Sequence, residues 1–279
     1  MTEVGTQAQS PVAPETPHPA PEQRTRSGLY SVQSLAGTIV IAVFVITFIV
    51  QAFQIPSESM EKTLLIGDYL LVDKAHYGES RVWNWLLPYR PIHRQDIIVF
   101  RYPVNPKQHF VKRVVAIPGD HIRLLDKHVY VNGVRQNDSY ATFRWGWRDR
   151  FRDDFPDGGF YGGQVTSAWF VQAQTLLQDG ELIVPRDCYF VLGDNRDDSY
   201  DSRYWGFVPR ENVVGRPLLI YWSMDRGDTA LDAASSSDRL SRLTSDPGSS
   251  SRTILARWSG DASQLLNSFR WHRVLQIPR

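Results

Sequence analysis

The longest apolar stretch of this 279-residue chain lies near its N-terminus. No charged residue occurs from Leu29 to Ser57, and residues 35–53 (LAGTIVIAVFVITFIVQAF) are almost wholly apolar. About 20 such residues in a helix span the ~30 Å hydrocarbon layer of a membrane. The β-branched content also fits a strand pair, but a core helix would carry a polar stripe and a cleaved signal would be shorter. The pattern predicts a transmembrane anchor over residues 29–54.

The residues before the anchor differ in composition. Residues 1–28 are rich in Pro, Thr, Gln and Ala, which cannot form a packed core, so we expect a disordered tail. Arg24 and Arg26 precede the apolar stretch, whereas Glu58 is the first charged residue after it. Because Lys and Arg are enriched on the cytoplasmic side of membrane proteins, we expect a cytoplasmic N-terminus.

After the anchor, short runs rich in Val, Ile, Tyr and Phe alternate with Gly, Pro, Asn and Asp. The runs are 69–72, 96–102, 110–117, 122–125, 129–131, 189–192 and 217–222. The Asn132-Gly133 pair is typical of a tight turn between antiparallel strands. The spacing predicts a mainly β fold, an antiparallel-sheet domain over residues 55–225.

Three later segments depart from this pattern. Residues 137–181 contain FRWGWRDRFRDDFPDGGFYGG and are too long for one loop of a compact domain, so they predict an inserted subdomain. Residues 226–252 are rich in Ser, Asp and Arg and predict a flexible linker. Residues 253–279 mix tryptophan, arginine and apolar residues, which suits either a membrane interface or packing against the β domain.

Charge and cysteine content exclude several classes of function. The formal net charge of +1 argues against a nucleic-acid-binding protein, which would carry a clustered basic excess. The single cysteine, Cys188, permits no intramolecular disulfide and no metal site built on paired cysteines. We expect Cys188 to be a small buried apolar residue.

The candidate nucleophiles follow the anchor in the segment PSESMEKTL. Ser57 and Ser59 are two residues apart, so they could supply a nucleophile and a hydrogen-bond donor for an oxyanion, although juxtamembrane serines are usually only solvated. A serine also needs a base, and the seven histidines show no triad or metal spacing. A lysine can serve instead when burial removes its charge.

Lys112 is a candidate for this base because it interrupts the apolar run FVKRVVAI. The two-residue period of a strand puts Phe110, Val114 and Ala116 on the same face as Lys112. An edge-strand lysine that faces water fits this run equally well. A second polar feature, GDNRDDSYDSRYWG at residues 193–206, follows an apolar run and predicts either a network of Asp and Arg pairs or a solvated turn.

Four segments together resemble the signature boxes of type I signal peptidases (leader peptidases), in the family's order. They are PSESM, GDYLLVDK at residues 67–74, KRVVAIPGD at residues 112–120, and GDNRDDSYDSRYWG at residues 193–206. The resemblance covers residues 55–223. It implies a serine endopeptidase with Ser59 as nucleophile and Lys112 as general base, and with Ser57 joining the Ser59 N–H in the oxyanion hole.

The resemblance also implies the surroundings of this dyad. Ser199 would orient the lysine, and the supporting ion-pair network would consist of Asp194, Asp201 and Arg203. Neither a metal nor an organic cofactor is implied. The implied partners are the lipid bilayer and secretory preproteins with small residues at the first and third positions before the cut. The implied location is the inner membrane, crossed once, with the catalytic domain in the periplasm.

Two departures from the family pattern leave an alternative open. Lys62 stands where the family usually has proline, and Asp198 where it often has asparagine. Lys62 also completes Ser59-x-x-Lys62, as in penicillin-binding proteins and serine β-lactamases. That alternative requires a helix with serine and lysine one turn apart and K-T-G and S-D-N elements, neither of which occurs. A non-catalytic anchored β domain would leave the ordered boxes unexplained.

These alternatives differ in the lysine they require. We expect Ser59→Ala and Lys112→Ala each to abolish preprotein cleavage in a membrane assay, because they remove the nucleophile and its base. Lys62→Ala should keep most of the activity. An inactive Lys62→Ala beside an active Lys112→Ala would reverse the assignment.

Overall fold

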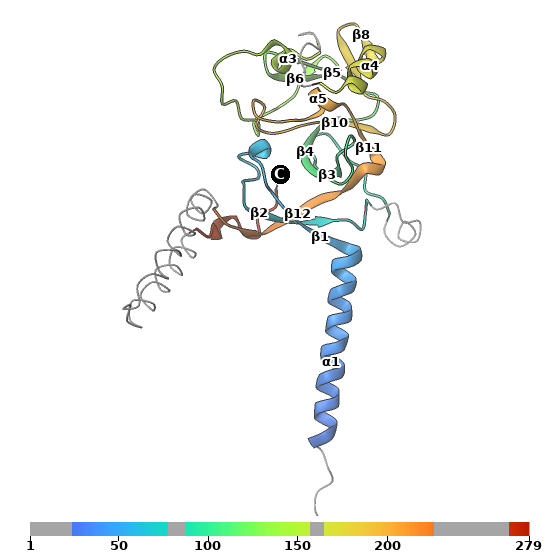
Figure 1. Cartoon of the computed structure of the whole chain (residues 1–279), viewed down its shortest axis with the longest axis vertical. Helices are drawn as coiled ribbons and strands as arrows, with labels where there is room; N and C mark the ends of the chain where they lie inside the picture. The colour runs from blue at the N-terminus through green and yellow to red at the C-terminus, as the bar shows by residue number, and fades with distance from the viewer. Residues whose placement is uncertain (1–23, 78–87, 157–164, 226–267, 279) are drawn as a thin grey trace, which may run out of the picture. The chain divides into compact units, whose positions relative to one another are not determined.

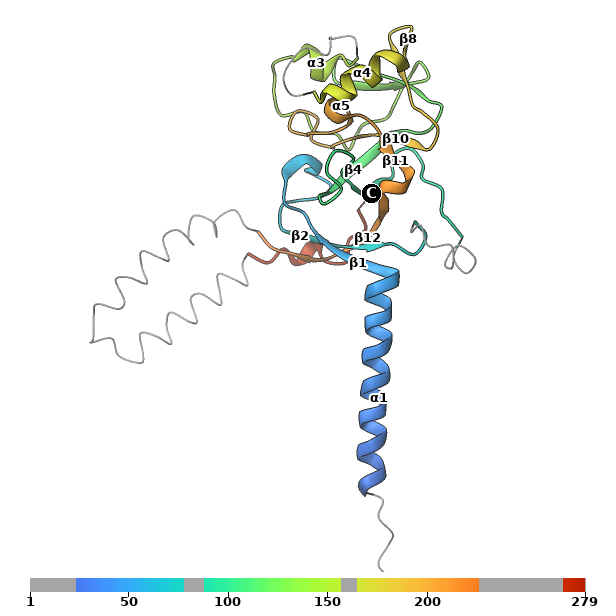
Figure 2. The same cartoon turned by 45° about the vertical axis from the view of Figure 1, so that its right-hand side comes forward.

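The computed structural model describes residues 24–77, 88–156, 165–225 and 268–278 (Figures 1 and 2). The chain divides into two compact units, residues 1–44 and 45–279. The predicted linker, 226–252, and most of the predicted N-terminal tail lie outside the described residues.

The described part of the first unit, residues 24–44, is the helix α1 (Arg24–Phe44), of 21 residues. At 1.5 Å per residue it is about 31 Å long, which matches the hydrocarbon layer. The stretch Tyr30–Thr47 has a mean hydropathy of 1.8 and is not buried, and it is the one helical stretch among the described residues that is long and apolar enough to cross a membrane.

The bounds of this helix differ from the predicted anchor, 29–54. The helix begins inside the predicted tail, at Arg24, and ends at Phe44. A wide helical turn follows at Val45–Ile49, and Val50–Gln54 forms strand β1, paired antiparallel with residues 69–73. Val50–Gln54 (VQAFQ) has polar residues at its second and last positions, and its backbone groups are satisfied by strand pairing. The apolar run that predicted the anchor therefore includes both the helix and part of this strand.

The second unit is built on a seven-stranded antiparallel sheet in the order β1-β2-β12-β3-β4-β10-β11. Its other strands are β2 (Asp68–Asp73), β3 (Ile97–Arg101), β4 (His109–Ala116), β10 (Cys188–Leu192), β11 (Val208–Pro209) and β12 (Val213–Ser223). Short helical segments lie at η2 (Glu58–Met60), α5 (Ser202–Trp205) and η3 (Arg210–Asn212). The prediction of a mainly β, antiparallel fold is confirmed.

The large sheet has a hydrophobic core on each face, and β3 contributes to both. Ile97 and Val99 pack with Met60 and Leu64 in one core, whereas Ile98 and Phe100 belong to the other. The two-residue alternation of a strand produces this division. These four residues are all buried, which explains why the run is continuously apolar rather than alternating.

A smaller five-stranded sheet has the order β7-β6-β5-β9-β8. Its strands are β5 (His121–Leu125), β6 (His128–Val131), β7 (Val134–Arg135), β8 (Leu177–Gln178) and β9 (Glu181–Ile183). Helices α3 (Arg150–Asp153) and α4 (Ser167–Leu176) lie with it at the top of Figure 1. The Asn132-Gly133 turn, with positive φ at both residues, joins β6 to β7 as predicted. This sheet combines strands from before residue 137 with β8, which lies within 137–181, and β9, which begins at the last residue of that segment.

The last described segment, 268–278, packs against the large sheet. Phe269 forms an isolated antiparallel β-bridge with Met224, and the Leu275 N–H donates to the Ile220 carbonyl at 2.7 Å. Arg273, in the short helix η4 (Trp271–Arg273), is 8% exposed and ion-paired with the fully buried Asp68 at 2.6 Å. This part of the predicted tail therefore packs on the β domain, and residues 253–267 lie outside the described part of the chain.

The Arg273–Asp68 pair gives a stability prediction. Arg273→Ala should lower the free energy of unfolding by about 3 kcal/mol, because it leaves a buried carboxylate without its counter-ion. Arg270→Ala is the matched control, since its partner Asp225 is 59% exposed, and it should change that free energy by less than about 1 kcal/mol. Urea unfolding of the full chain in detergent measures both. Equal losses would contradict the role of the Arg273 pair.

Candidate active site

Ser59 lies in the single 3₁₀ turn η2, which follows β1. The turn is closed by the Glu61 N–H, which donates to the Glu58 carbonyl at 2.9 Å, and Met60 anchors it in the core. On its other side, the Asn195 N–H donates to the Ser59 carbonyl at 3.1 Å. Ser59 is 9% exposed, and its Oγ lies 3.3 Å from the Oγ of the exposed Ser57. The two candidate hydroxyls therefore lie together.

Lys112 lies in the middle of β4, opposite Ile98 of β3. Strand β4 lies between β3 and β10, so the alternative of an edge-strand lysine is wrong. Lys112 is 4% exposed, on the face that carries Phe110 and Val114. Burial lowers the pKa of Lys112 to about 8, against the Asp201 carboxylate, which acts to raise it. A substantial fraction of this amine is therefore neutral, and able to accept a proton, at a pH near 8.

The loop after β10 joins the serine turn to Ser199. A Cβ on Gly193 would lie 2.3 Å from Ser199 Oγ and 2.4 Å from the Ser59 carbonyl oxygen. Only glycine allows this close approach. Ser199 is buried, and its hydroxyl lies close enough to Asp201 to help hold the pKa of that carboxyl below its usual value. Its contact with the Lys112 amine, which the resemblance implies, stays a prediction.

Asp201 and Arg203 form a buried two-armed ion pair. The Arg203 Nε and Nη2 atoms donate to the two Asp201 oxygens, both at 2.8 Å. Burial acts to raise the pKa of Asp201, but Arg203, with smaller contributions from Lys112 and the Ser199 hydroxyl, holds that pKa below its usual value. The Gly193 N–H also donates to Asp201, at 3.1 Å, and this hydrogen bond connects the ion pair to the loop beside Ser59.

Asp194 pairs with Arg113 rather than with Arg203. The Arg113 Nε and Nη2 atoms donate to Asp194 at 2.8 and 2.6 Å, and both side chains are fully or almost fully buried. Thr63 Oγ1 donates to the same carboxylate at 2.5 Å. The three residues predicted to form one network thus belong to two separate ion pairs, Asp201–Arg203 and Asp194–Arg113. The Asp194–Arg113 pair also contacts Thr63, just after the serine turn.

Ser57, Ser59 and Lys112 line one cleft of about 490 Å³. Its other walls come from the end of β1, the serine turn, the start of β4 and the loop after β10, as residues 53–56, Glu58, Met60, 109–111, Asp198 and Tyr200. No hydrogen bond joins Lys112 Nζ to Ser59 Oγ in the described part of the chain, so their pairing stays a prediction. Catalytic hydrogen bonds are often long before substrate binds.

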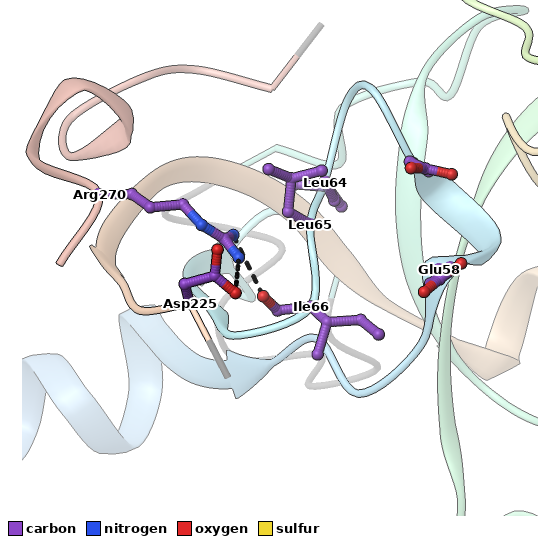
Figure 3. Close-up of a pocket in the computed structure, with 7 residues that line it drawn as sticks. Glu58, Leu64, Leu65, Ile66, Asp225 and Arg270 are labelled. Atoms are coloured by element: carbon purple, nitrogen blue, oxygen red, sulfur yellow. Dashed lines mark hydrogen bonds and ion pairs between the residues drawn. The ribbon is translucent and has the colours of Figure 1, made fainter. Parts of the chain in front are cut away.

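A second pocket, of about 280 Å³, lies beside the serine turn (Figure 3). Glu58 lines both cavities. The loop Leu64, Leu65 and Ile66 forms its apolar wall, and Arg270 closes it by donating to the Ile66 carbonyl at 3.2 Å and pairing with Asp225 at 3.1 Å. The C-terminal segment therefore borders the serine turn on the side of this pocket.

Lys62 does not occupy the position that the Ser59-x-x-Lys62 alternative requires. Turn η2 ends at Met60, and Lys62 has a left-handed backbone with φ of 74° and an exposed side chain. Serine and lysine are therefore not one helical turn apart, and the alternative loses its structural premise.

Sequence reasoning missed three residues that hold the serine turn: Arg113, Asn195 and Arg144. The first two belong to quoted boxes, adjacent to Lys112 and Asp194, and an alternating-face argument could have placed Arg113 on the face opposite Lys112. No local signal identifies Arg144, because its partners Glu58 and Glu61 lie more than 80 residues away. The described residues contain no group of three His, Cys, Asp or Glu side chains arranged to hold a metal ion.

Comparison with known proteins gives consistent matches. A family model described as signal peptidase, peptidase S26, matches residues 29–222. A signal peptidase I of Aquifex aeolicus is 36% identical over 227 residues, 66% of this chain and 81% of that protein. A signal peptidase I of Buchnera aphidicola subsp. Acyrthosiphon pisum is 31% identical over 250 residues, 74% and 80% of the two chains. A crystal structure of a signal peptidase I from Enterococcus faecalis is 32% identical and covers 46% of this chain and 97% of that chain, with a TM-score of 0.33.

Proposed function

The chain belongs to the signal peptidase family, peptidase S26, as a membrane-anchored serine endopeptidase that removes signal peptides, and on that premise we propose that Ser59 is its nucleophile and Lys112 its general base. The observation that carries this proposal is the burial of Lys112 in the cleft that also contains Ser59, with its pKa lowered to about 8. A lysine serves as a base only when it is neutral, and this environment favours the neutral form.

The proposed reaction proceeds through an acyl-enzyme. The Lys112 amine accepts the proton of Ser59 Oγ as that oxygen attacks the carbonyl carbon of the scissile bond. The Ser57 hydroxyl and the Ser59 N–H donate to the resulting oxyanion. Lys112 then gives its proton to the leaving amine, which frees the mature protein. Water, deprotonated by the same amine, hydrolyses the ester and restores Ser59.

Around the dyad, we propose that Ser199 orients the Lys112 amine while Asp201 and Arg203 fix the loop that carries Ser199. The burial of Ser199, the action of its hydroxyl on Asp201 and the two-armed Asp201–Arg203 pair support these roles. Asp194 acts at the serine turn instead, through Arg113 and Thr63.

The proposed substrates are secretory preproteins with small residues at the first and third positions before the cut. Apolar side chains of the cleft, among them Ile55, Met60 and Val111, support binding of small side chains and exclusion of bulky ones. We further propose that α1 crosses the inner membrane once, with its N-terminus in the cytoplasm and the domain of residues 55–225 in the periplasm. Arg24 and Arg26 at the start of α1 support this orientation.

Cleavage of a purified preprotein by the full chain in lipid vesicles tests the function, with the cut located by mass spectrometry. Ser57→Ala should lower kcat about 10²–10³-fold, because one oxyanion donor contributes that much, while substrate still binds. The control is replacement of the small residue at the first position before the cut by phenylalanine, which should block cleavage. An unchanged kcat would remove Ser57 from the oxyanion hole, and no cleavage by the unaltered chain would contradict the function.

A further inference from the structure

Arg144 connects the predicted insertion to the serine turn. Its Nη1 donates to Glu58 Oε2 at 2.6 Å, and its Nη2 pairs with Glu61 Oε2. Glu58 and Glu61 flank Ser59 and Met60, and their backbones share the hydrogen bond that closes the turn. One guanidinium therefore bridges both ends of the turn that carries Ser59.

The backbone on either side of Arg144 is fixed. The Thr142 N–H donates to the Asp194 carbonyl at 2.7 Å, and the Thr142 carbonyl accepts from the Arg196 N–H at 3.0 Å. The Trp145 N–H donates to Asp197 at 2.7 Å, and its carbonyl accepts from Lys127 Nζ at 2.8 Å. An ordinary surface ion pair contributes little because two free side chains must be ordered. Here the backbone on both sides of Arg144 is already held by hydrogen bonds, three of them to the loop after β10.

We propose that Arg144 is a positioning residue for signal-peptide cleavage, which holds the Ser59 turn by bridging Glu58 and Glu61. The inference rests on the proposed role of Ser59. The Asn195 N–H holds the same turn through the Ser59 carbonyl, so the turn is fastened from both sides. Arg144 is not among the described residues that line the cleft, so it acts on the nucleophile rather than on the substrate.

The test compares Arg144→Ala with Arg148→Ala in the full chain, with a preprotein as substrate. Arg148 serves as the control, because it belongs to the same segment and is half exposed, and its ion pair, with the buried Asp154 at 2.5 Å, does not involve the serine turn. Arg144→Ala should lower kcat about tenfold, equivalent to about 1.4 kcal/mol of barrier, with KM within about twofold. Arg148→Ala should keep the unaltered kcat. Arg144→Lys should recover part of the loss, and Glu58→Gln with Glu61→Gln should reproduce it.

Several results would overturn the proposal. They are an unchanged kcat in Arg144→Ala, an equal loss in Arg148→Ala, a rise in KM alone, or full activity in the double Gln variant. The melting temperature of Arg144→Ala should lie within about 2 °C of that of the unaltered chain, and a lower kcat that follows a lower melting temperature in every variant would also contradict the proposal. Failure of the proposed function is distinct, because the unaltered chain would then not cleave or Ser59→Ala would remain active.

Discussion

The site depends on one costly arrangement, the burial of the Lys112 amine. Removing an ammonium group from water disfavours its charged form, which is why the pKa of Lys112 falls to about 8. A free buried carboxylate nearby would reverse this effect by holding the proton on the amine. The two buried carboxylates near Lys112 are instead already matched, Asp201 with Arg203 and Asp194 with Arg113, and the exposed Asp198 raises the pKa of Lys112 less than either of them. The ion pairs thus do more than stiffen a loop, since they limit how strongly their carboxylates hold the lysine in its charged form.

The same matched groups place the serine turn. The loop after β10 contacts that turn through Gly193 and Asn195, and its Asp194 reaches Thr63 on the far side of the turn. Arg273 of the C-terminal segment donates to the Thr63 carbonyl at 2.9 Å while it neutralises Asp68. Segments from the start, middle and end of the β domain therefore converge on the few residues around Ser59. A nucleophile outside regular secondary structure needs such support to keep a defined position.

Much of the fold follows from local pattern. Each of the seven predicted runs forms a strand, because runs of β-branched and aromatic residues bounded by turn residues are a strong local signal. The short strands β7, β8, β9 and β11 were not predicted, since two or three residues show no clear period. The predicted anchor ran to residue 54, although the helix ends at Phe44, because strand β1 that follows also contains apolar residues, of which Phe53 packs against the core of the large sheet. Hydropathy does not distinguish an apolar strand from the end of an apolar helix.

The candidate residues show a similar division. Ser57, Ser59, Lys112 and Ser199 could be selected because they lie in recognisable boxes, whereas their partners depend on long-range contacts. The resemblance placed Asp194 in one network with Asp201 and Arg203, but tertiary packing pairs it with Arg113, 81 residues away. Arg144 lies 86 residues from Glu58, in a segment whose composition indicates only an insertion. Which charged residues pair with each other depends on the folded chain, so no local sequence pattern predicts it.

The ionisation of Lys112 tests the central claim most directly. The full chain in detergent, labelled at the lysine side chains, can be titrated by NMR, with the Lys112 signal assigned through its loss in Lys112→Arg. The account predicts a pKa of about 8 for Lys112, so that the amine loses its proton well below the ordinary lysine value of 10.5. A pKa near 10.5 would mean that Lys112 stays charged at neutral pH, and would contradict its role as the base for Ser59.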